Sequence, residues 1–232
     1  MGNTNLELVA FAKKALNEHW GYCLGTFGNI LTPQLLKQKM SQGYGVGSYN
    51  TRHKAYLEGF INKHVSDCYG LVKAFVWWNN GDVKYVPSQD RNQEGAFKAA
   101  KEKGPIRSIP EIPGLVLWMK GHAGIYIGNG EFIECVGAPV GMRKGKIVNG
   151  KIVYGSRFTH WFKDTYISYP VAPPNTIQIK LNGKTRFVKG YYKAGTNYIT
   201  FDRVDLPVRL VAETLGLKVG WDQATETVIL ND

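Results

Sequence analysis

The sequence of 232 residues contains few cysteines, no long apolar run and no recognisable export signal. Cys23, Cys68 and Cys135 are an odd number without CxxC spacing, which argues against a disulfide framework or a zinc ribbon and favours a reducing compartment. No stretch reaches the roughly 18 apolar residues of a membrane span, so we expect none. Because the N-terminus lacks a basic head followed by an apolar run, we expect synthesis in the cytoplasm without a signal peptide.

Positive charge, by contrast, is abundant and uneven. The formal net charge is +11. From Asn175 onward there are eight basic and six acidic residues, so most of the excess lies before that position. A basic domain suits an anionic polymer or surface, such as nucleic acid, an anionic membrane or the phosphate-bearing wall of a Gram-positive cell. Charge by itself does not choose among these partners, and a merely solubilising surface is the alternative.

A proline-rich segment divides the chain into two parts. It begins Pro170-Val171-Ala172-Pro173-Pro174 and has the composition of a stiff spacer between folded units. We therefore predict a first domain at residues 1–169, a linker at 170–176 and a small module at 177–232.

Helical spacing precedes strand spacing in the first part. Apolar residues recur at helical intervals over 6–16 and 66–78, and Thr32 followed by Pro33 has the form of a helix N-cap and first turn. Three later segments favour antiparallel strands, at 114–119, 124–127 and 131–134. This order predicts an α+β fold in which N-terminal helices pack on an antiparallel sheet.

The second part is predicted to be a small α+β module. Asn182-Gly183 marks the turn of a hairpin, and the amphipathic segment 206–215 is predicted to be a helix closed by Gly216. Two short strands are expected at 217–221 and 227–230.

Cys68 is the candidate nucleophile. It lies at the start of the predicted helix 66–78, where unpaired backbone amides and the helix dipole favour a thiolate and could also stabilise an oxyanion. Ser66 or Asp67 can cap this helix, and Gly70 leaves the backbone near the sulfur uncrowded. The alternative is that Cys68 is a small buried apolar residue.

His122 is the candidate base, and Glu134 is the candidate residue that orients its ring. If Gly128-Asn129-Gly130 forms a three-residue loop with Gly130 left-handed, Gly124 pairs with Glu134. His122, Tyr126 and Glu134 then share one face, while Ile125, Ile127, Ile133 and Cys135 share the other. A two-residue turn would place His122 and Glu134 on opposite faces. We predict the first register because it separates polar from apolar side chains better. Cys135 and Cys23 are then expected in the core.

Two other histidines carry no assigned chemistry. His64 is expected on the surface, before the helix, and His160 is assigned neither to packing nor to the edge of a groove. A zinc site built from Cys68, His122, His160 and Glu134 is a further alternative, but these residues lack a standard ligand spacing. We therefore expect neither a metal nor another cofactor.

Several blocks together resemble the NlpC-type family of papain-like cell-wall peptidases. They are Ser66-Asp67-Cys68-Tyr69-Gly70-Leu71-Val72, then Pro113-Gly114-Leu115-Val116, then Gly121-His122-Ala123-Gly124-Ile125-Tyr126-Ile127-Gly128-Asn129-Gly130. Upstream, Trp20-Gly21-Tyr22-Cys23-Leu24-Gly25-Thr26 looks like the substrate-site motif of that family. The resemblance covers roughly residues 5–169.

The resemblance implies a papain-like domain with Cys68 as nucleophile, His122 as general base and Glu134 in the third position. It also implies that Tyr22 and Asp67 line the substrate groove. Many members have His where this chain has Glu134. Tyr69, often Ser in the family, is bulkier and is also expected to contact substrate.

The implied reaction is hydrolysis of an amide in the peptide stem of Gram-positive peptidoglycan through a thioester on Cys68. The family target is usually the γ-D-glutamyl–diamino acid bond. Related enzymes cut the muramoyl–L-alanine amide or cross-bridges, so an N-acetylmuramoyl-L-alanine amidase is the alternative.

The second part has its own resemblance. Asn182-Gly183-Lys184, the segment 206–216, Val219-Gly220-Trp221-Asp222 and the segment 225–229 look like the copper amine oxidase N-terminal-like domain. No His or Cys follows His160, which leaves no imidazole or thiolate metal ligand there. On secreted and wall proteins such modules resemble attachment units, so wall binding is expected here. A stabilising or dimerising appendage is the alternative.

A catalytic head, a linker and a wall module without an export signal resemble a phage endolysin that acts at the wall after release, whereas a secreted autolysin would usually have a signal peptide. The rival from another class is a basic nucleic-acid-binding protein with aromatic platforms. Trp77, Trp78 and Trp118 lie in apolar segments that are typical of a core, so no nucleic-acid partner is expected.

Overall fold

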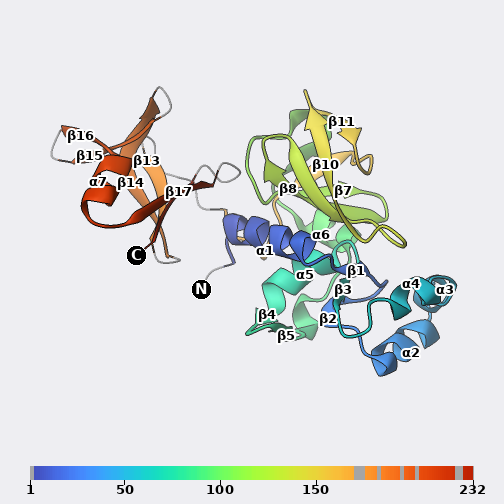
Figure 1. Ribbon diagram of the computed structural model, residues 1–232. Helices are drawn as coiled ribbons and strands as arrows, with labels where there is room; N and C mark the ends of the chain where they lie inside the picture. The colour runs from blue at the N-terminus through green and yellow to red at the C-terminus, as the bar shows by residue number, and fades with distance from the viewer. Residues whose placement is uncertain are drawn as a thin grey trace. The chain divides into compact units, whose positions relative to one another are not determined.

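The computed structural model describes residues 3–169, 176–181, 184–193, 196–201, 204–222 and 227–231 (Figure 1). The chain separates into two compact units, Met1–Tyr169 and Pro170–Asp232. Most of the predicted linker, residues 170–175, and the predicted Asn182-Gly183 turn lie outside the described residues.

The first unit begins with the helix α1 (Asn5–Asn17), which forms where the apolar spacing predicts it. Thr4 caps the helix by accepting a hydrogen bond from the Glu7 amide, and the Glu7 side chain accepts one from the Thr4 amide. The apolar face of α1 contacts the large sheet and the helix α5 (Gly70–Trp77). The second predicted helix is α2 (Pro33–Ser41), capped by Thr32 with Pro33 in the first turn, as expected.

A seven-stranded antiparallel sheet forms the centre of the first unit. Its strands, in spatial order, are β11 (Lys151–Tyr154), β10 (Met142–Val148), β9 (Glu131–Cys135), β8 (His122–Gly128), β7 (Val116–Met119), β12 (His160–Phe162) and β6 (Lys103–Pro105). The predicted strands correspond to β7, β8 and β9. The helices and antiparallel strands together confirm the α+β class.

Each face of this sheet packs against a core of its own. Successive side chains of a strand point to opposite faces, so each strand contributes to both cores. On one face Val116, Ile125 and Ile133 pack in the core that includes α1 and α5. On the other face a second core holds Tyr126 and Phe132, together with Leu115, Leu117, Ile147 and Phe158.

The β8–β9 hairpin contains the predicted pair of Gly124 with Glu134, but its loop differs from the predicted one. Gly128 pairs with Glu131, so Asn129 and Gly130, both left-handed with φ of 54° and 71°, form a two-residue turn. The extra residue expected in the loop lies instead in a bulge between Tyr126 and Gly128, and this bulge keeps His122 and Glu134 on one face. Cys135 and Cys23 are fully buried, which confirms that both belong to the core.

A smaller group of elements forms the other part of the first unit. In Figure 1, α2, α3 and α4 lie at the end of the unit opposite β10 and β11. A three-stranded sheet has the order β1-β3-β2. The elements are β1 (Gly21–Tyr22), β2 (Phe27–Ile30), α3 (Val46–Arg52), α4 (Lys54–Glu58), β3 (His64–Ser66), β4 (Trp78–Asn79), β5 (Asp82–Val83), α6 (Gln93–Ala99), and the short 3-10 helices η1 (Pro87–Gln89) and η2 (Ile106–Ser108).

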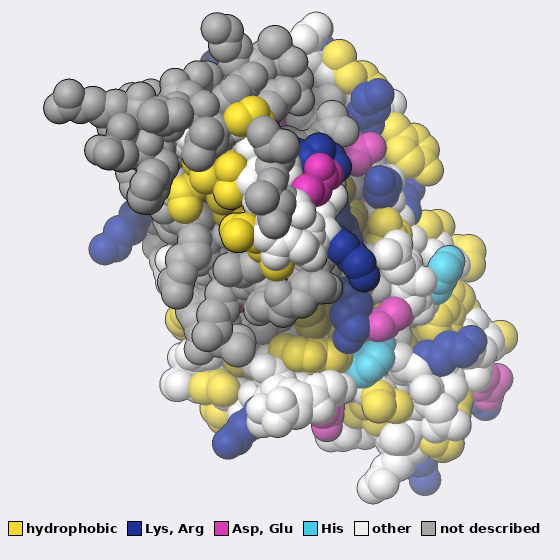
Figure 2. Space-filling view, turned by 60° about the vertical axis from the view of Figure 1, so that its left-hand side comes forward, with side chains coloured by type: hydrophobic (Ala, Val, Ile, Leu, Met, Phe, Trp, Pro, Cys, Tyr) yellow, Lys and Arg dark blue, Asp and Glu magenta, His cyan; other side chains and the backbone are white. Residues whose placement is uncertain are grey.

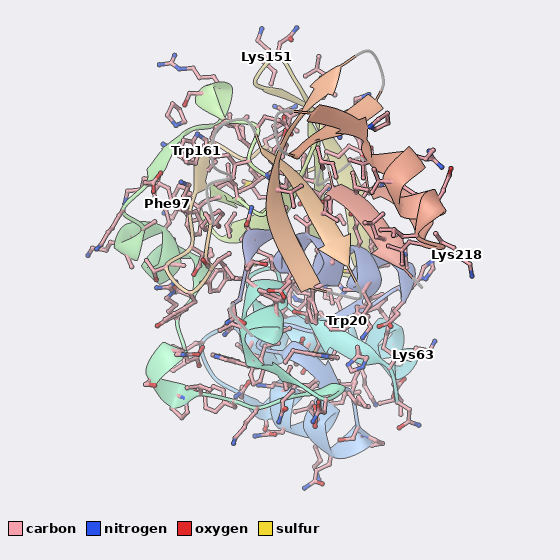
Figure 3. The ribbon with its side chains drawn as sticks, turned by 90° about the vertical axis from the view of Figure 1, so that its left-hand side faces the viewer. Trp20, Lys63, Phe97, Lys151, Trp161 and Lys218 are labelled. Carbon is pink, nitrogen blue, oxygen red and sulfur yellow. The ribbon has the colours of Figure 1, made fainter. Side chains whose placement is uncertain are left out.

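The aromatic residues of the first unit pack mainly against one another. Trp77 is buried, and Trp78 and Trp118 are partly buried against the core, as expected. Trp20, labelled in Figure 3, stacks on Trp78 with ring centroids 5.7 Å apart. Trp118 stacks on Phe97 at 4.3 Å. These rings therefore contribute to the core.

The second unit is a six-stranded sheet with one helix, and it forms its own small core. The strands are β13 (Thr176–Leu181), β14 (Lys184–Lys193), β15 (Thr196–Phe201), β16 (Val204–Pro207), β17 (Lys218–Asp222) and β18 (Thr227–Asn231). The helix α7 (Val208–Thr214) begins later than predicted, because residues 206 and 207 pair with β15. Gly216 follows it with a φ of 77°.

None of the helices in the described ranges is long and apolar enough to cross a membrane.

Candidate active site

Cys68 lies in the turn that joins β3 to α5. The helix begins at Gly70, not near residue 66 as the sequence predicted, because residues 64–66 pair with β1 and β2. Asp67 holds this turn: its Oδ1 accepts a hydrogen bond from the Gly70 amide at 2.6 Å, and its Oδ2 accepts one from the Gly25 amide at 3.1 Å. The predicted capping role of Asp67 is therefore present, but Cys68 precedes the helix by two residues.

The Cys68 thiol is buried. Its exposed fraction is 8%. Burial and then the neighbouring Asp67 carboxylate raise the pKa of Cys68 to about 12, whereas nearby amides, including those of Ala123 and Tyr69, act in the opposite direction. The predicted lowering of this pKa by the helix start is wrong for the free protein, because desolvation outweighs the amides. The neutral thiol is the favoured form.

His122 opens strand β8, between two residues that approach Cys68. The amide of Ala123 donates a hydrogen bond to the Cys68 sulfur, and Gly121 borders the same cavity as Cys68. The His122 ring stacks on Phe158 with centroids 5.4 Å apart. Its Nε2 lies 2.6 Å from Oε2 of Glu134. Because Glu134 holds Nε2, Nδ1 is the ring nitrogen that can act as a base.

Glu134 is fully buried and held from both oxygens. While Oε2 meets His122, Oε1 accepts hydrogen bonds from Nε of Arg143 at 2.9 Å and from the Ser156 amide at 3.0 Å. Burial alone would raise the pKa of Glu134, but the hydrogen bonds from His122 and Ser156 outweigh it and lower the pKa to about 2. Glu134 is thus a carboxylate at neutral pH.

Arg143 and Ser156 are members of the site that the sequence analysis missed. Arg143 lies directly opposite Glu134 in the β9–β10 pairing, on a strand that the sequence analysis did not predict. A basic residue across from a buried acid could have indicated it, but only after β10 had been recognised. Ser156 contributes a backbone amide, which no sequence pattern reveals.

Cys68 borders a cavity of about 700 Å³, and the three predicted substrate residues line the same cavity. Tyr22 is 8% exposed, and its pKa is raised by burial, by Cys68 and by Asp67. The complete lining is Tyr22, Leu24, Gly25, Tyr44, Val46, Asp67, Cys68, Tyr69, Lys73, Asp90, Arg91, Asn92, Gln93 and Gly121.

The hydroxyl of Tyr69 is occupied by a buried network. It donates to Oδ2 of Asp164 at 2.6 Å and accepts from Nε of Arg91 at 3.2 Å. Arg91 also reaches Oδ1 of Asp164 at 2.6 Å and packs over the Tyr166 ring. Tyr69 therefore shapes the cavity wall with its ring and positions Arg91, another residue that the sequence analysis missed.

Tyr44 stands at the edge of the cavity without packing. It is fully exposed, lies between Gly43 and Gly45, and has a left-handed φ of 55°. Such a backbone is unusual for a bulky residue and costs on the order of 1 kcal/mol or more. The site thus includes an exposed aromatic ring on a strained turn, which the sequence analysis did not single out.

The other two histidines discussed above lie elsewhere. His64 is partly buried, not on the surface as expected, because its ring stacks on Trp20 at 4.7 Å and its Nδ1 meets the Gly28 carbonyl. His160 contacts Thr159 and the edges of Phe97 and Trp118. Within the described part of the chain, no three His, Cys, Asp or Glu side chains gather to form a metal site.

Comparison with known proteins finds one family model that matches the second unit. Residues 171–232 match the family model of the copper amine oxidase N-terminal domain. These residues contain no His, Cys or Met, the side chains that bind copper most readily, so the module does not fit a copper site of that kind. No curated protein matches the chain, and no solved structure matches it.

Proposed function

We propose that the first unit is a papain-like cysteine amidohydrolase of the NlpC type that cuts peptidoglycan. The observation that carries the proposal is the His122–Glu134 pair, in which a buried carboxylate holds Nε2 of the imidazole. The residues before and after His122 in the chain approach Cys68: Gly121 borders its cavity, and the Ala123 amide acts on its sulfur. A nucleophile, a base and a group that orients the base are the parts that acyl transfer through a thioester requires.

The chemistry follows from the protonation states. Because the pKa of Cys68 is raised, His122 must accept the thiol proton through Nδ1 as the sulfur attacks the amide carbon. Glu134 stabilises the imidazolium that results. His122 then gives the proton to the leaving amine, and the acyl group remains on Cys68 as a thioester. Water, deprotonated by His122, attacks the thioester and releases the carboxylic acid and the thiol.

The proposed substrate is the peptide stem of Gram-positive peptidoglycan, cut at the γ-D-glutamyl–diamino acid bond. The cavity volume of about 700 Å³ falls in the range of about 300–1,000 Å³ that is typical of small-ligand sites, enough for a short peptide segment. The sequence blocks around Cys68 and His122 support the same substrate class. An N-acetylmuramoyl-L-alanine amidase on the same residues is the alternative.

We further propose that the second unit attaches the enzyme to the wall and that the protein acts as a phage endolysin after release from the host cytoplasm. The match to a family model and the separate core support an independent module. The net charge of +11, most of it in the first unit, adds to the retention of the whole protein on an anionic wall.

The test is digestion of purified Gram-positive sacculi, followed by mass spectrometry of the released fragments. New amino termini on diamino acids are expected, and free L-alanine termini would instead identify the amidase. If sacculi from several wall types stay intact but bind the protein, the catalytic proposal is wrong and the wall-binding proposal stands.

Tyr44 is expected to contact the substrate. Replacing Tyr44 with Gly removes the exposed ring and relaxes the left-handed backbone, so kcat/KM on sacculi should fall roughly tenfold while Tm stays equal or rises. Tyr44→Phe should retain most of the activity, because the ring remains. Steady-state kinetics and thermal unfolding measure both effects, and a Gly variant with unchanged kinetics would remove Tyr44 from the site.

A further inference from the structure

A second surface of the first unit has charge that the proposed chemistry does not use. No Asp or Glu occurs between Glu134 and Asp164, whereas six Lys and Arg do. This stretch contains the β10–β11 hairpin, and β11 is an edge strand of the seven-stranded sheet. Figure 2 shows Lys and Arg side chains with Asp and Glu side chains beside them at several places on the visible surface.

Ion pairs neutralise only half of these six cations. The paired ones each meet a glutamate, and they are Arg143, Lys144 and Lys163. Lys146, Lys151 and Arg157 are exposed, and they form no ion pair with any residue that the structure describes. Glu131 lies across from Lys146 in the β9–β10 pairing but already forms its ion pair with Lys144, so the hairpin retains an excess of positive charge.

Arg107 adds a cation at the hairpin turn. Its backbone lies so close to Gly150 that a Cβ built there would be 2.7 Å from the Arg107 carbonyl oxygen. The Arg107 side chain is exposed and has no ion pair within the described ranges. Lys151 is at the outer end of the same hairpin, as labelled in Figure 3. Lys146 and Lys151 thus lie on the hairpin itself, and Arg107 lies beside its turn.

Apolar side chains are exposed among these cations. Val148 is 43% exposed and pairs with Lys151, whereas Tyr154 is 61% exposed and pairs with Lys146. Val153, which precedes Tyr154 on β11, is 58% exposed. Lysines on an edge strand would be enough to discourage pairing with another chain. Exposed valines would favour contact with another chain, so protection of the sheet edge does not explain why cations and exposed apolar side chains occur together here.

We propose that the β10–β11 hairpin, with Arg107, is a peripheral binding surface for an anionic lipid bilayer. Lysine and arginine side chains near such a surface are attracted to the lipid phosphates, and Val148, Val153 and Tyr154 can enter the apolar part of the interface. A phosphodiester polymer would attract the cations but gain little from valines. A nucleic acid would need several aromatic platforms, and the hairpin has only Tyr154 exposed.

The experiment is vesicle flotation with the full chain, using phosphatidylglycerol-containing vesicles and phosphatidylcholine vesicles at low salt. The wild type should float with the anionic vesicles only. The R107Q/K146Q/K151Q variant should partition about 100-fold less, because each cation contributes about a fivefold factor. A matched variant that removes three exposed cations elsewhere, K37Q/K84Q/K101Q, should bind nearly as well as the wild type.

A second variant separates the lipid from other anionic partners. V148S/V153S retains every charge but should lose most of the vesicle binding, with circular dichroism confirming the fold. Equal binding by this variant, equal losses in the matched lysine variant, or retention only on isolated wall polymer or DNA would each overturn the proposal. Because Cys68→Ala leaves the hairpin intact, binding is expected to persist whether or not the protein cuts peptidoglycan.

Discussion

Replacing Cys68 with Ala should abolish the release of peptides from sacculi, with a loss on the order of 10⁴-fold or more. No other residue that lines the cavity can form the thioester, because Cys68 is the one cysteine that borders it. The variant should stay folded, since only one sulfur is removed from a site that adjoins an open cavity. Fragment release by mass spectrometry and thermal unfolding measure the two effects.

The matched control is Cys23→Ala. Cys23 is fully buried in a separate core with Leu31 and Leu36, so its loss should reduce stability by about 1–2 kcal/mol and leave the reaction in place. Fragment release by the Cys68→Ala protein at the wild-type rate would remove Cys68 as the nucleophile and direct the search to another group.

Glu134→Gln should affect both catalysis and acid stability. The carboxylate holds Nε2 of His122 and favours the imidazolium, so its loss should lower kcat by about 10²–10⁴-fold. It also leaves Arg143 without its anionic partner. Steady-state kinetics at neutral pH measure the first effect, and a variant with the wild-type kcat would remove Glu134 from the catalytic group.

The acid dependence follows from the direction of the pKa shift. The pKa of Glu134 is lowered from 4.5 to about 2 in the folded protein, so the ionised form of this carboxyl group is stabilised in the folded state relative to the unfolded state. The stabilisation, roughly 3 kcal/mol, is fully present above about pH 4.5 and is lost as the pH falls toward 2. Glu134→Gln should flatten this part of the stability profile in denaturant unfolding.

Glu131→Gln provides the matched control on the same strand. The Glu131 side chain is 44% exposed and pairs with Lys144, so its removal should change the free energy of unfolding by less than about 1 kcal/mol. Identical acid profiles for both variants and the wild type would mean that Glu134 is not held as the structure indicates.

Local patterns in the sequence determined the first elements and the arrangement of the candidate pair. Capping at Thr4 and Thr32 depends on residues three positions apart, so it can be recognised without the fold. The β8–β9 register was accessible because a slip of one residue would have exchanged polar and apolar faces. That one register brought His122 and Glu134 to the same side.

Only the tertiary structure decided the surroundings of these residues. The pKa of Cys68 depends on how deeply the sulfur is buried and on Asp67, whose carboxylate is fixed by an amide from a distant loop. Arg91 and Asp164 meet although their segments are far apart in the chain, and Arg143 meets Glu134 only because β10 pairs with β9. The helix α7 starts late because residues 206 and 207 pair with a strand. Burial and long-range pairing depend on the whole fold, whereas caps, turns and strand alternation depend on neighbours in the sequence.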